Sequence, residues 1–454
     1  MPAVKLLHHA DVLACIDDAG TEIADGAVAW RDGVIVAVGS SAQLAPLAQE
    51  ADEVIDARGC VVTPGLVNTH HHLYQSLTRA VPGAIDASLF GWLKRLYPIW
   101  ARYTPEDVFA ATQLGLAELA LSGCTTTSDH HYLFPAGVTL DDSIHAAREV
   151  GLRFHATRGA MSVGESQGGL PPDSVVEDEA AILADTIRVI DRFHDAAEGA
   201  MLRVAVAPCS PFSVSTDLMR ESALLARDKG VMMHTHLAED ADDVAFSLER
   251  FGCRPGEYAE QLGWVGPDVW HAHCVQLDAA EIALFARTGT GLAHCPCSNC
   301  RLGSGIAPLR AMLDAKVPVG LGVDGSASND SGHLLAEARQ AMLLQRVVHG
   351  ADRFDPRTAL RLATRGGAQV LGRPDVGALE PGKRADIAVW NVADVPSSGA
   401  WDKVAGLVLS PPRQARDVFV EGRAVVRGGE LVQVRRDAVL RAADRSLARL
   451  MTFA

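Results

Sequence analysis

The sequence contains no run of apolar residues long enough to cross a lipid bilayer, which requires about 20 of them. Apolar stretches are interrupted early, and "AVAW", for example, is followed at once by "RDG". The first residues, "MPAVKLLHHADVLACIDDAG", carry one lysine and lack the apolar core of a secretory signal. We therefore expect a cytoplasmic protein that neither spans nor binds a membrane.

The sequence also has fewer basic than acidic residues, and its cysteines show no pattern of disulfide pairs. Lys and Arg total 41 against 56 Asp and Glu, for a formal net charge of −15. A nucleic-acid partner is disfavoured because phosphate binders need a basic surface, so we expect a small neutral or cationic ligand. The nine cysteines are odd in number and scattered, which suits a reducing compartment better than a disulfide framework.

Short β-rich runs separated by glycine turns occur at both ends of the 454-residue chain. "GAVAW" and "VIVAVG" flank an Asp32-Gly33 pair, which is typical of a tight hairpin turn. "PGKRADIAVW" and "ARDVFVEGRAVV" have the same texture near the other end. The pattern predicts one β-sandwich domain built from residues 1–60 and 379–454, including a C-terminal helix, with a second domain of residues 61–378 inserted between them.

The inserted segment contains eight short apolar runs that end in polar residues, with helical segments between most of them. The runs are "VVTPGLVNTHHH", "CTTTSDHH", "LRFHATRGA", "LRVAVAPCS", "VMMHTHLAE", "VWHAHC", "GLAHCPCSN" and "VPVGLGVDGS". One intervening helix is predicted over 104–123, with Thr104 as N-cap, Pro105 in the first turn and Gly123 as the stop. Eight strand–helix units favour an α/β fold of the (β/α)8 (TIM) barrel type, with chemistry at the carboxyl ends of the strands. A doubly wound open sheet is the alternative, but no glycine fingerprint follows the first strand.

The first barrel strand ends in three consecutive histidines, "NTHHHL". On extended backbone, alternate side chains share a face and lie about 7 Å apart. His70 and His72 therefore point toward the barrel interior together, whereas His71 points away.

Three other predicted strand ends offer metal ligands. They are His234, His236 and Glu239 in "HTHLAE", His271 and His273 in "HAHC", and Asp324 in "GVDGS". Each motif alone is ordinarily a packed histidine or a turn. Together with "NTHHHL", however, the three motifs fall at the ends of strands one, five, six and eight of the predicted barrel. Imidazole nitrogens with one carboxylate suit Zn²⁺ best, with Fe²⁺ as a possible substitute.

A competing zinc motif lies in "HCPCSNC", where Pro296, Cys297 and Cys300 match half of the cytidine-deaminase signature. The other half, His-x-Glu, occurs nowhere among the seventeen histidines. Cys295, Cys297 and Cys300 are therefore interpreted as packed thiols of the loop after strand seven.

The motifs "PGLVNTHHHL", "HTHLAE", "HAHC", "HCPCSN" and "GVDGSASND" resemble those of the amidohydrolase superfamily, in the branch of guanine deaminase, S-adenosylhomocysteine deaminase and the triazine hydrolases. The resemblance covers nearly the whole chain. It implies His70, His72, His236 and Asp324 as zinc ligands, with Asp324 also accepting a proton from the attacking water. Glu239 is then the proton shuttle, and His273 holds the water in place. Relatives often form dimers or larger assemblies, so a homo-oligomer is consistent with the resemblance.

One departure from the family concerns the number of metal ions. Members with two metals use a carboxylated lysine at the end of strand four, and this chain has "APCS" there. A single metal ion per chain follows, which favours deaminases over ring-opening relatives.

Five residues are candidate substrate contacts. Gln75 matches a position where guanine deaminases contact the purine, and its alternative role is to cap a loop. Arg158, Cys209, His131 and Trp92 are candidate pocket walls, although Arg158 is equally suited to a salt-bridged rim, and His131 and Trp92 to structural packing.

The substrate itself is suggested by three segments of the chain. The runs "NTHHHLYQSLTRA", "TTTSDHHYLF" and "RFHATRGAMS" are similar to enzymes that deaminate 8-oxoguanine to urate and ammonia. The alternatives are guanine, a pterin such as isoxanthopterin, or a triazine. A barrel kept only as an interaction scaffold is disfavoured because every ligand of the family pattern is present.

Overall fold

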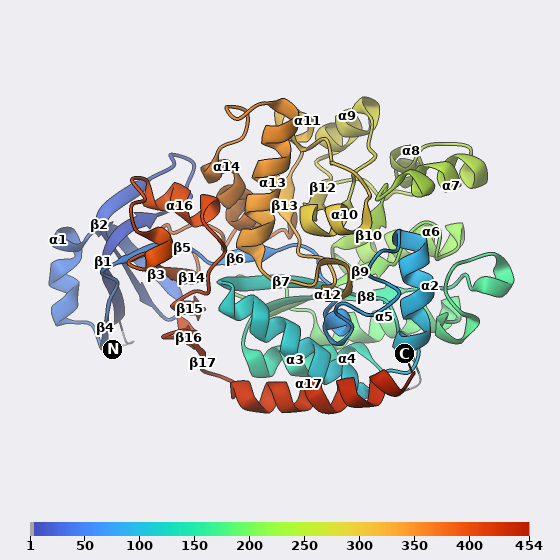
Figure 1. The fold of residues 1–454 in the computed structure, drawn as a ribbon, viewed down its shortest axis with the longest axis horizontal. Helices are drawn as coiled ribbons and strands as arrows, with labels where there is room; N and C mark the ends of the chain where they lie inside the picture. Colours follow the sequence, from blue (N-terminus) through green and yellow to red (C-terminus); the bar gives the residue numbers. More distant parts are fainter. Residues whose placement is uncertain (1–3, 136, 454) are drawn as a thin grey trace.

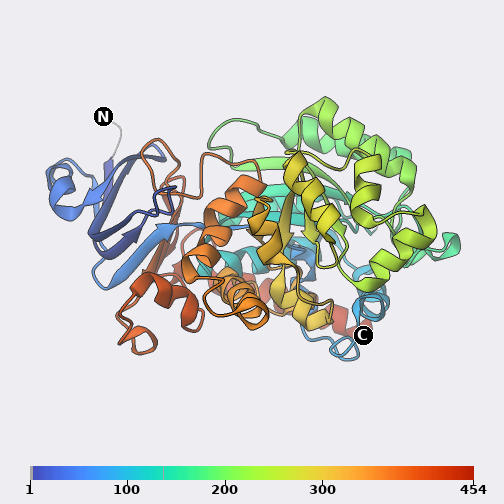
Figure 2. The ribbon, with the colours of Figure 1, turned by 90° about the horizontal axis from the view of Figure 1, so that it is seen from above.

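A computed structural model describes residues 4–135 and 137–453 and divides the chain into a barrel and a sheet beside it (Figures 1 and 2). Strands from both ends of the chain form the sheet, at the left of Figure 1. The intervening segment forms a closed barrel of eight parallel strands surrounded by helices. The predicted TIM barrel is confirmed. Among the described residues, no helix is both long and apolar enough to cross a bilayer.

The sheet of chain-end strands has nine members in the order β17-β16-β15-β14-β5-β1-β2-β3, with β4 paired to β1. Most pairs are antiparallel, but β1 runs parallel to β4 and β5. The predicted Asp32-Gly33 turn joins β2 to β3, and both residues have positive φ, as a type I′ hairpin requires. The strands are β1 (Val4–Ala14), β2 (Glu22–Arg31), β3 (Val34–Ser40), β4 (Glu53–Asp56), β5 (Cys60–Pro64), β14 (Ile387–Asn391), β15 (Asp417–Val420), β16 (Arg423–Arg427) and β17 (Glu430–Leu431).

The barrel is closed in the order β6-β7-β8-β9-β10-β11-β12-β13, and the pairing of Leu321 with Asn68 completes the ring. These strands correspond to the eight apolar runs. Their bounds are β6 (Leu66–Asn68), β7 (Cys124–His131), β8 (Arg153–Ala160), β9 (Leu202–Pro208), β10 (Met233–Leu237), β11 (Val269–His273), β12 (Gly291–His294) and β13 (Val319–Leu321).

Helices surround the barrel and bury one large apolar core against it. The predicted helix after the first strand is α3 (Pro105–Leu121), with Thr104 and Asp107 forming a capping box and Gly123 left-handed just beyond its end. The other helices are α1 (Ser41–Leu44), α2 (Leu89–Trp100), α4 (Leu140–Val150), α5 (Glu179–Phe193), α6 (Thr216–Lys229), α7 (Ala241–Phe251), α8 (Pro255–Gln261), α9 (Ala279–Thr288), α10 (Pro296–Leu302), α11 (Leu309–Asp314), α12 (Ser326–Asn329), α13 (Leu334–His349), α14 (Pro356–Arg361), α15 (Gly367–Val370), α16 (Lys403–Leu409) and α17 (Arg436–Leu450).

A buried arginine joins the barrel to the sheet. Arg153, at the start of β8, pairs with Asp386 and Glu421 and also donates hydrogen bonds to two backbone carbonyls, those of Gly199 and Ala200. Its guanidinium is fully buried, so the loss of either carboxylate would leave an uncompensated charge. The two parts are therefore fixed to each other by specific contacts.

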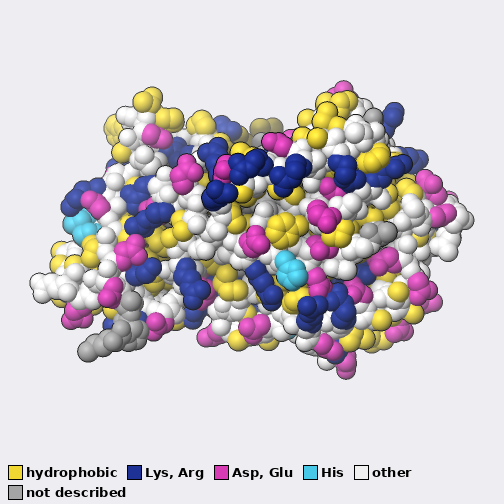
Figure 3. Space-filling model, turned by 90° about the horizontal axis from the view of Figure 1, so that it is seen from below, with side chains coloured by type: hydrophobic (Ala, Val, Ile, Leu, Met, Phe, Trp, Pro, Cys, Tyr) yellow, Lys and Arg dark blue, Asp and Glu magenta, His cyan; other side chains and the backbone are white. Residues whose placement is uncertain are grey.

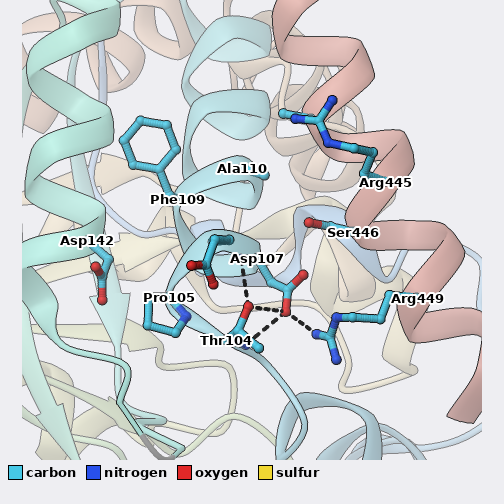
Figure 4. Close-up of a pocket in the computed structure, with 11 residues that line it drawn as sticks. Thr104, Pro105, Asp107, Phe109, Ala110, Asp142, Arg445, Ser446 and Arg449 are labelled. Atoms are coloured by element: carbon cyan, nitrogen blue, oxygen red, sulfur yellow. Dashed lines mark hydrogen bonds and ion pairs between the residues drawn. The ribbon is translucent and has the colours of Figure 1, made fainter.

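The C-terminal helix α17 lies on the barrel and not on the sheet. It runs alongside α3, and Arg449 pairs with Asp107, the same carboxylate that caps α3 (Figure 4). The groove between these helices has a volume of about 710 Å³ and is lined by Glu106, Asp142 and Arg445 among others. It contains neither histidine nor cysteine, so its lining offers none of the imidazole or thiolate donors that zinc prefers.

Surface charges of both signs are interspersed with isolated apolar side chains on the face shown in Figure 3. Exposed apolar residues of α17 include Leu440 and Leu447, and the exposed Met451 follows the end of this helix. No broad basic face is visible in this view, in keeping with the negative net charge.

Candidate metal centre

Three histidines and one aspartate meet inside the carboxyl end of the barrel. His70 and His72 follow β6, His236 lies in β10, and Asp324 follows β13. The Nε2 atoms of His70 and His72 are each 3.2 Å from Asp324 Oδ1, and His72 Nε2 is 3.1 Å from His236 Nε2. All four residues are buried.

The second ring nitrogen of each histidine has a hydrogen-bond partner. His72 Nδ1 is 2.7 Å from the backbone oxygen of His130, and His236 Nδ1 is 2.6 Å from that of Cys209. His70 Nδ1 is 2.8 Å from His234 Nε2, and His234 Nδ1 is in turn 2.8 Å from the Trp270 oxygen. Because carbonyls only accept, these contacts place the hydrogen on Nδ1 and leave the Nε2 lone pairs facing one another.

This arrangement fits a divalent metal ion. His70 Nε2 and Asp324 Oδ1 are buried and have no hydrogen-bond partner among the described residues, which is costly unless the two atoms share a cation. Burial lowers the pKa of His70 and of His236 well below the usual range, so both are neutral, as metal ligands must be. Two overlapping groups of ligand atoms lie within 4.8 Å of one another. The first is formed by His70, His72, His130 and His236, and the second by His70, His236, His273 and Asp324.

One of these groups contains His130, which the sequence interpretation passed over. His130 Nε2 is 3.0 Å from the Ala207 oxygen, its Nδ1 has no partner, and its ring stacks on that of His236 at 4.7 Å. His71, in contrast, turns toward Gly115 of α3, where a side chain larger than glycine would contact its Nε2. Neither ring nitrogen of His71 has a partner within the described part of the chain.

Glu239 and His273 stand beside the cluster at the ends of β10 and β11. His273 Nε2 is 3.5 Å from Glu239 Oε2 and 4.0 Å from Asp324 Oδ2. His273 Nδ1 is 2.9 Å from Asn299 Oδ1, which as an acceptor leaves the Nε2 lone pair directed into the site. Burial, reinforced by Asp324, raises the pKa of Glu239 well above its usual range, so this carboxyl holds a proton readily.

The backbone around these residues is strained. Ala238, His273 and Asp324 have φ values of 50°, 69° and 60°, in the left-handed region that non-glycine residues rarely adopt. All three lie at the ends of barrel strands that carry the site. Strain of this kind persists only where surrounding contacts impose it, and it is concentrated at functional sites.

A narrow pocket leads to the cluster. Its free volume is about 30 Å³, far below the roughly 300 Å³ at which small-molecule pockets begin, so lining side chains must move to admit a heterocycle. Trp92, Leu93 and Tyr97 of α2 form one wall, and Tyr132 and Phe212 are also exposed to the pocket. The complete lining is His72, Gln75, Leu89, Trp92, Leu93, Tyr97, Tyr132, Cys209, Phe212, His236, Glu239, His273, Leu302, Asp324 and Ser328, and it includes no lysine or arginine.

Three of the five candidate substrate contacts line this pocket. Gln75 Oε1 is buried and has no hydrogen-bond partner in the part of the chain that the structure describes. Gly325 leaves room for this oxygen, since a Cβ at position 325 would come within 1.8 Å of it. Burial raises the pKa of the Cys209 thiol to about 12, so this thiol is neutral. Trp92 Nε1 donates a hydrogen bond to the Ala327 oxygen at 3.0 Å, which ties α2 to the loop after β13.

The other two candidates lie outside the pocket. Arg158 pairs with Glu177 and Asp185, both at 2.7 Å, and its guanidinium lies over the ring of Phe134. His131 contacts Ser143 of α4 and the Leu133 oxygen. Both side chains point outward from the barrel, and their polar atoms already have partners. The structure therefore favours a salt-bridged role for Arg158 and a packing role for His131 over substrate contact.

The remaining histidines and cysteines are also placed by the structure. His271 Nε2 is 3.0 Å from the Trp264 oxygen and its ring packs against Phe285, away from the cluster. No cysteine belongs to either group of candidate metal ligands found among the residues described. The interpretation of Cys300 as a packed thiol is wrong, because Cys300 is exposed on α10.

Asp243 supports the turn that carries Glu239. Its Oδ2 accepts a hydrogen bond from the Glu239 backbone N–H at 2.8 Å, while its Oδ1 is buried and has no partner within residues 4–135 and 137–453. Burial, together with the nearby Asp240, raises the pKa of Asp243 to about 7.

An Asp243→Asn variant is expected to gain stability relative to the wild type as the pH rises from about 4 to 7. In this range the folded protein keeps a proton that the unfolded chain, with a carboxyl pKa near 3.9, has lost. Wild-type stability therefore falls with rising pH by up to about 1.4 kcal/mol per pH unit until Asp243 ionises. Asparagine retains an acceptor for Glu239 and does not titrate, so the difference in melting temperature should level off above pH 7. The exposed neighbour Asp242→Asn serves as control, and a pH-independent difference for Asp243→Asn would contradict the assignment.

The fold and the cluster together define a metal-dependent barrel hydrolase, with its ligands at the carboxyl ends of the strands. The model of the amidohydrolase family matches residues 61–425. The chain therefore belongs to the amidohydrolase family.

Three relatives show where in the family the chain falls. It is 48% identical to an 8-oxoguanine deaminase from Pseudomonas aeruginosa over 90% of this chain and 91% of that protein. It is 40% identical to an isoxanthopterin deaminase from an unknown prokaryotic organism over 84% of each. The structure of an atrazine chlorohydrolase from Arthrobacter aurescens TC1, complexed with zinc, superposes on this chain with a TM-score of 0.93. The superposition covers 98% of this chain and 100% of the chlorohydrolase, and the two sequences are 33% identical.

Proposed function

We propose that this protein is a zinc-dependent aminohydrolase that converts 8-oxoguanine and water to urate and ammonia. The observation that carries the proposal is the buried cluster of His70, His72, His236 and Asp324, with Glu239 beside it in a pocket that lacks cationic side chains. The similarity to an 8-oxoguanine deaminase supports the choice of substrate. Nine cysteines without a disulfide support a cytoplasmic location.

His70, His72, His236 and Asp324 would hold one divalent cation. Such a cation acts as a Lewis acid and makes a water molecule acidic at neutral pH. Zinc is favoured over iron because three imidazoles and one carboxylate are ligands that it prefers, and because the atrazine chlorohydrolase was found with zinc. β9 ends at Pro208 and is followed by Cys209, so no lysine is present there to bridge a second ion.

Glu239 and His273 move and position protons in the proposed reaction. Glu239 protonates the ring nitrogen next to the carbon that bears the amine, so that this carbon accepts the attacking water. His273 Nε2 holds that water in line, and the Asp324 carboxylate, which lies 4.0 Å from His273 Nε2 at its nearer approach, receives the water proton. That proton then passes from Asp324 to the amine, the C–N bond breaks and ammonia leaves. The remaining hydroxyl proton returns to Glu239 as the carbon becomes a carbonyl.

The pocket lining suits an uncharged aromatic heterocycle. The Gln75 amide can accept from and donate to the edge of a purine, and the neutral Cys209 thiol is a weak donor. Trp92, Tyr97 and Tyr132 offer aromatic surface to a planar ring. A phosphate or carboxylate on the substrate would find no lysine or arginine in this lining, so a free base is favoured over a nucleotide.

A substrate panel tests the proposal. We expect kcat/KM for 8-oxoguanine to exceed that for guanine, isoxanthopterin and a chlorotriazine by at least tenfold, which corresponds to about 1.4 kcal/mol of selective transition-state binding. Urate is followed by absorbance and ammonia by a coupled assay, with metal content measured on the same sample. If 8-oxoguanine is inert while another compound is turned over, the substrate assignment is wrong and the aminohydrolase class stands.

Isoxanthopterin deamination is the second candidate, because a relative of that activity is 40% identical to this chain. A pterin is larger than a purine and needs more displacement of the α2 wall. Faster turnover of isoxanthopterin than of 8-oxoguanine would establish this alternative.

A further inference from the structure

The two oxygens of the Asp324 carboxylate have different surroundings. Oδ2 accepts hydrogen bonds from the hydroxyls of Ser298 at 2.5 Å and Ser328 at 2.8 Å. Oδ1 accepts none and faces His70 and His72. Two donors occupy the lone pairs of Oδ2, so Oδ1 is the oxygen left to bind a cation.

The two serines reach Asp324 from different helices. Ser298 belongs to α10, which follows β12, and Ser328 belongs to α12, which follows β13. Both hydroxyls are buried. The Ser328 hydroxyl is also 3.0 Å from the Gly325 oxygen, the competing acceptor for its single hydrogen.

A buried glutamate on a third helix joins α10 to α12. Glu337 of α13 accepts the backbone N–H of Cys297 through Oε2 at 3.1 Å and the side-chain amide of Asn329 through Oε1 at 2.7 Å. Cys297 and Asn329 are the immediate neighbours of Ser298 and Ser328. Glu337 is 1% exposed and does not line the pocket, so it acts on the site only through these helices.

We propose that Ser298 and Ser328 are positioning residues that leave Asp324 to bind the cation through Oδ1 alone. Glu337 holds the helices that carry these two serines at the required distance from each other. The inference rests on the proposed metal centre. Without the two hydroxyls, Oδ2 has no partner and the carboxylate is free to turn, so its affinity for the cation falls. Loss of hydrogen bonds that orient metal ligands typically costs 10- to 100-fold in affinity.

The test is the dissociation constant for Zn²⁺, measured on the purified full chain by competition with a chromophoric chelator. Ser298→Ala and Ser328→Ala are compared singly and together. Glu337→Gln alters the contacts between the helices that carry the two serines and leaves both serines in place. We expect 10- to 100-fold weaker zinc binding for the double variant and smaller losses for the others. Ser326→Ala is the matched control, because it also removes a buried hydroxyl from α12 but one that contacts Arg79 and not Asp324.

The outcomes separate positioning from general packing. Zinc affinity of the double variant within twofold of the wild type overturns the proposal, as does an equal loss in Ser326→Ala. If the double variant does not fold, the single variants and Glu337→Gln decide by the same criterion. Wild-type protein that binds zinc tightly but deaminates nothing in the panel refutes the proposed function alone, whereas wild-type protein that fails to bind zinc refutes both.

Discussion

Glu239→Gln should lower kcat for 8-oxoguanine by 100- to 10 000-fold, the range over which a positioned acid or base accelerates a reaction. Glutamine has the same shape and retains an oxygen near His273, but it cannot deliver a proton to the ring or accept one afterwards. Glu239 is well suited to this task, because burial keeps its pKa high and its Oε2 lies 3.5 Å from His273 Nε2. Steady-state measurement of urate formation gives both kcat and KM.

The Glu239→Gln variant should keep its metal and its fold. Glu239 is not among the groups of candidate ligands, so zinc content and melting temperature should match the wild type. Glu249→Gln, an exposed residue on α7, controls for the same chemical change nearby. Retention of more than half of the wild-type kcat by Glu239→Gln would remove this residue from the proton-transfer step.

Removal of the metal is expected to cost roughly a thousandfold in activity, since a Lewis acid contributes several kcal/mol and each 1.4 kcal/mol is a factor of ten. Dialysis against a chelator should abolish turnover, and added Zn²⁺ should restore it. His72→Ala should be equally inactive but should not be rescued at stoichiometric zinc, because His72 Nε2 faces both Asp324 and His236.

The adjacent His71 provides the control for this ligand assignment. His71→Leu removes the neighbouring imidazole but breaks no hydrogen bond seen in the described part of the chain, so zinc content and kcat should be preserved. If His71→Leu loses its metal while His72→Ala keeps it, the assignment of alternate histidines to the cluster is reversed.

The barrel could be predicted from the sequence because its signal is local and repeated. Each strand is a short apolar run, and each of the eight runs matches one strand of the closed ring. The pairing of His70 with His72 also follows from one rule, the alternation of side chains on extended backbone.

The same alternation applies to the two histidines that end β7, His130 and His131, because only one of them can face the interior. The sequence analysis names His131 as a candidate pocket wall, with structural packing as its alternative, and gives His130 no role. The structure places His130 against His236 and turns His131 toward α4. Arg158, on the neighbouring strand β8, faces outward in the same way and finds its partners on the outside of the barrel.

Contacts between separate loops were beyond the sequence for a different reason. "HCPCSN" was recognised as a motif and interpreted as structural, yet Ser298 contacts Asp324 and Asn299 contacts His273. Each contact joins residues 26 positions apart. Such pairings depend on how two loops pack at the barrel mouth, which no spacing within one motif encodes. The pocket wall contributed by α2 was only partly foreseen, through Trp92, for the same reason.

The pairing of β5 with β14 has a consequence for the order in which the chain acquires its structure during synthesis. Residues 60–64 wait for partners at 387–391, more than 300 positions later, and β6 has no second neighbour until residue 321 has emerged. The early strands are therefore exposed, unpaired edges for most of translation, when such edges invite aggregation. A nascent chain stalled before residue 386 is expected to depend on chaperones. Without the last 15% of the protein, the sheet begun by the first strands lacks β14 to β17, and Arg153 lacks its partner Asp386.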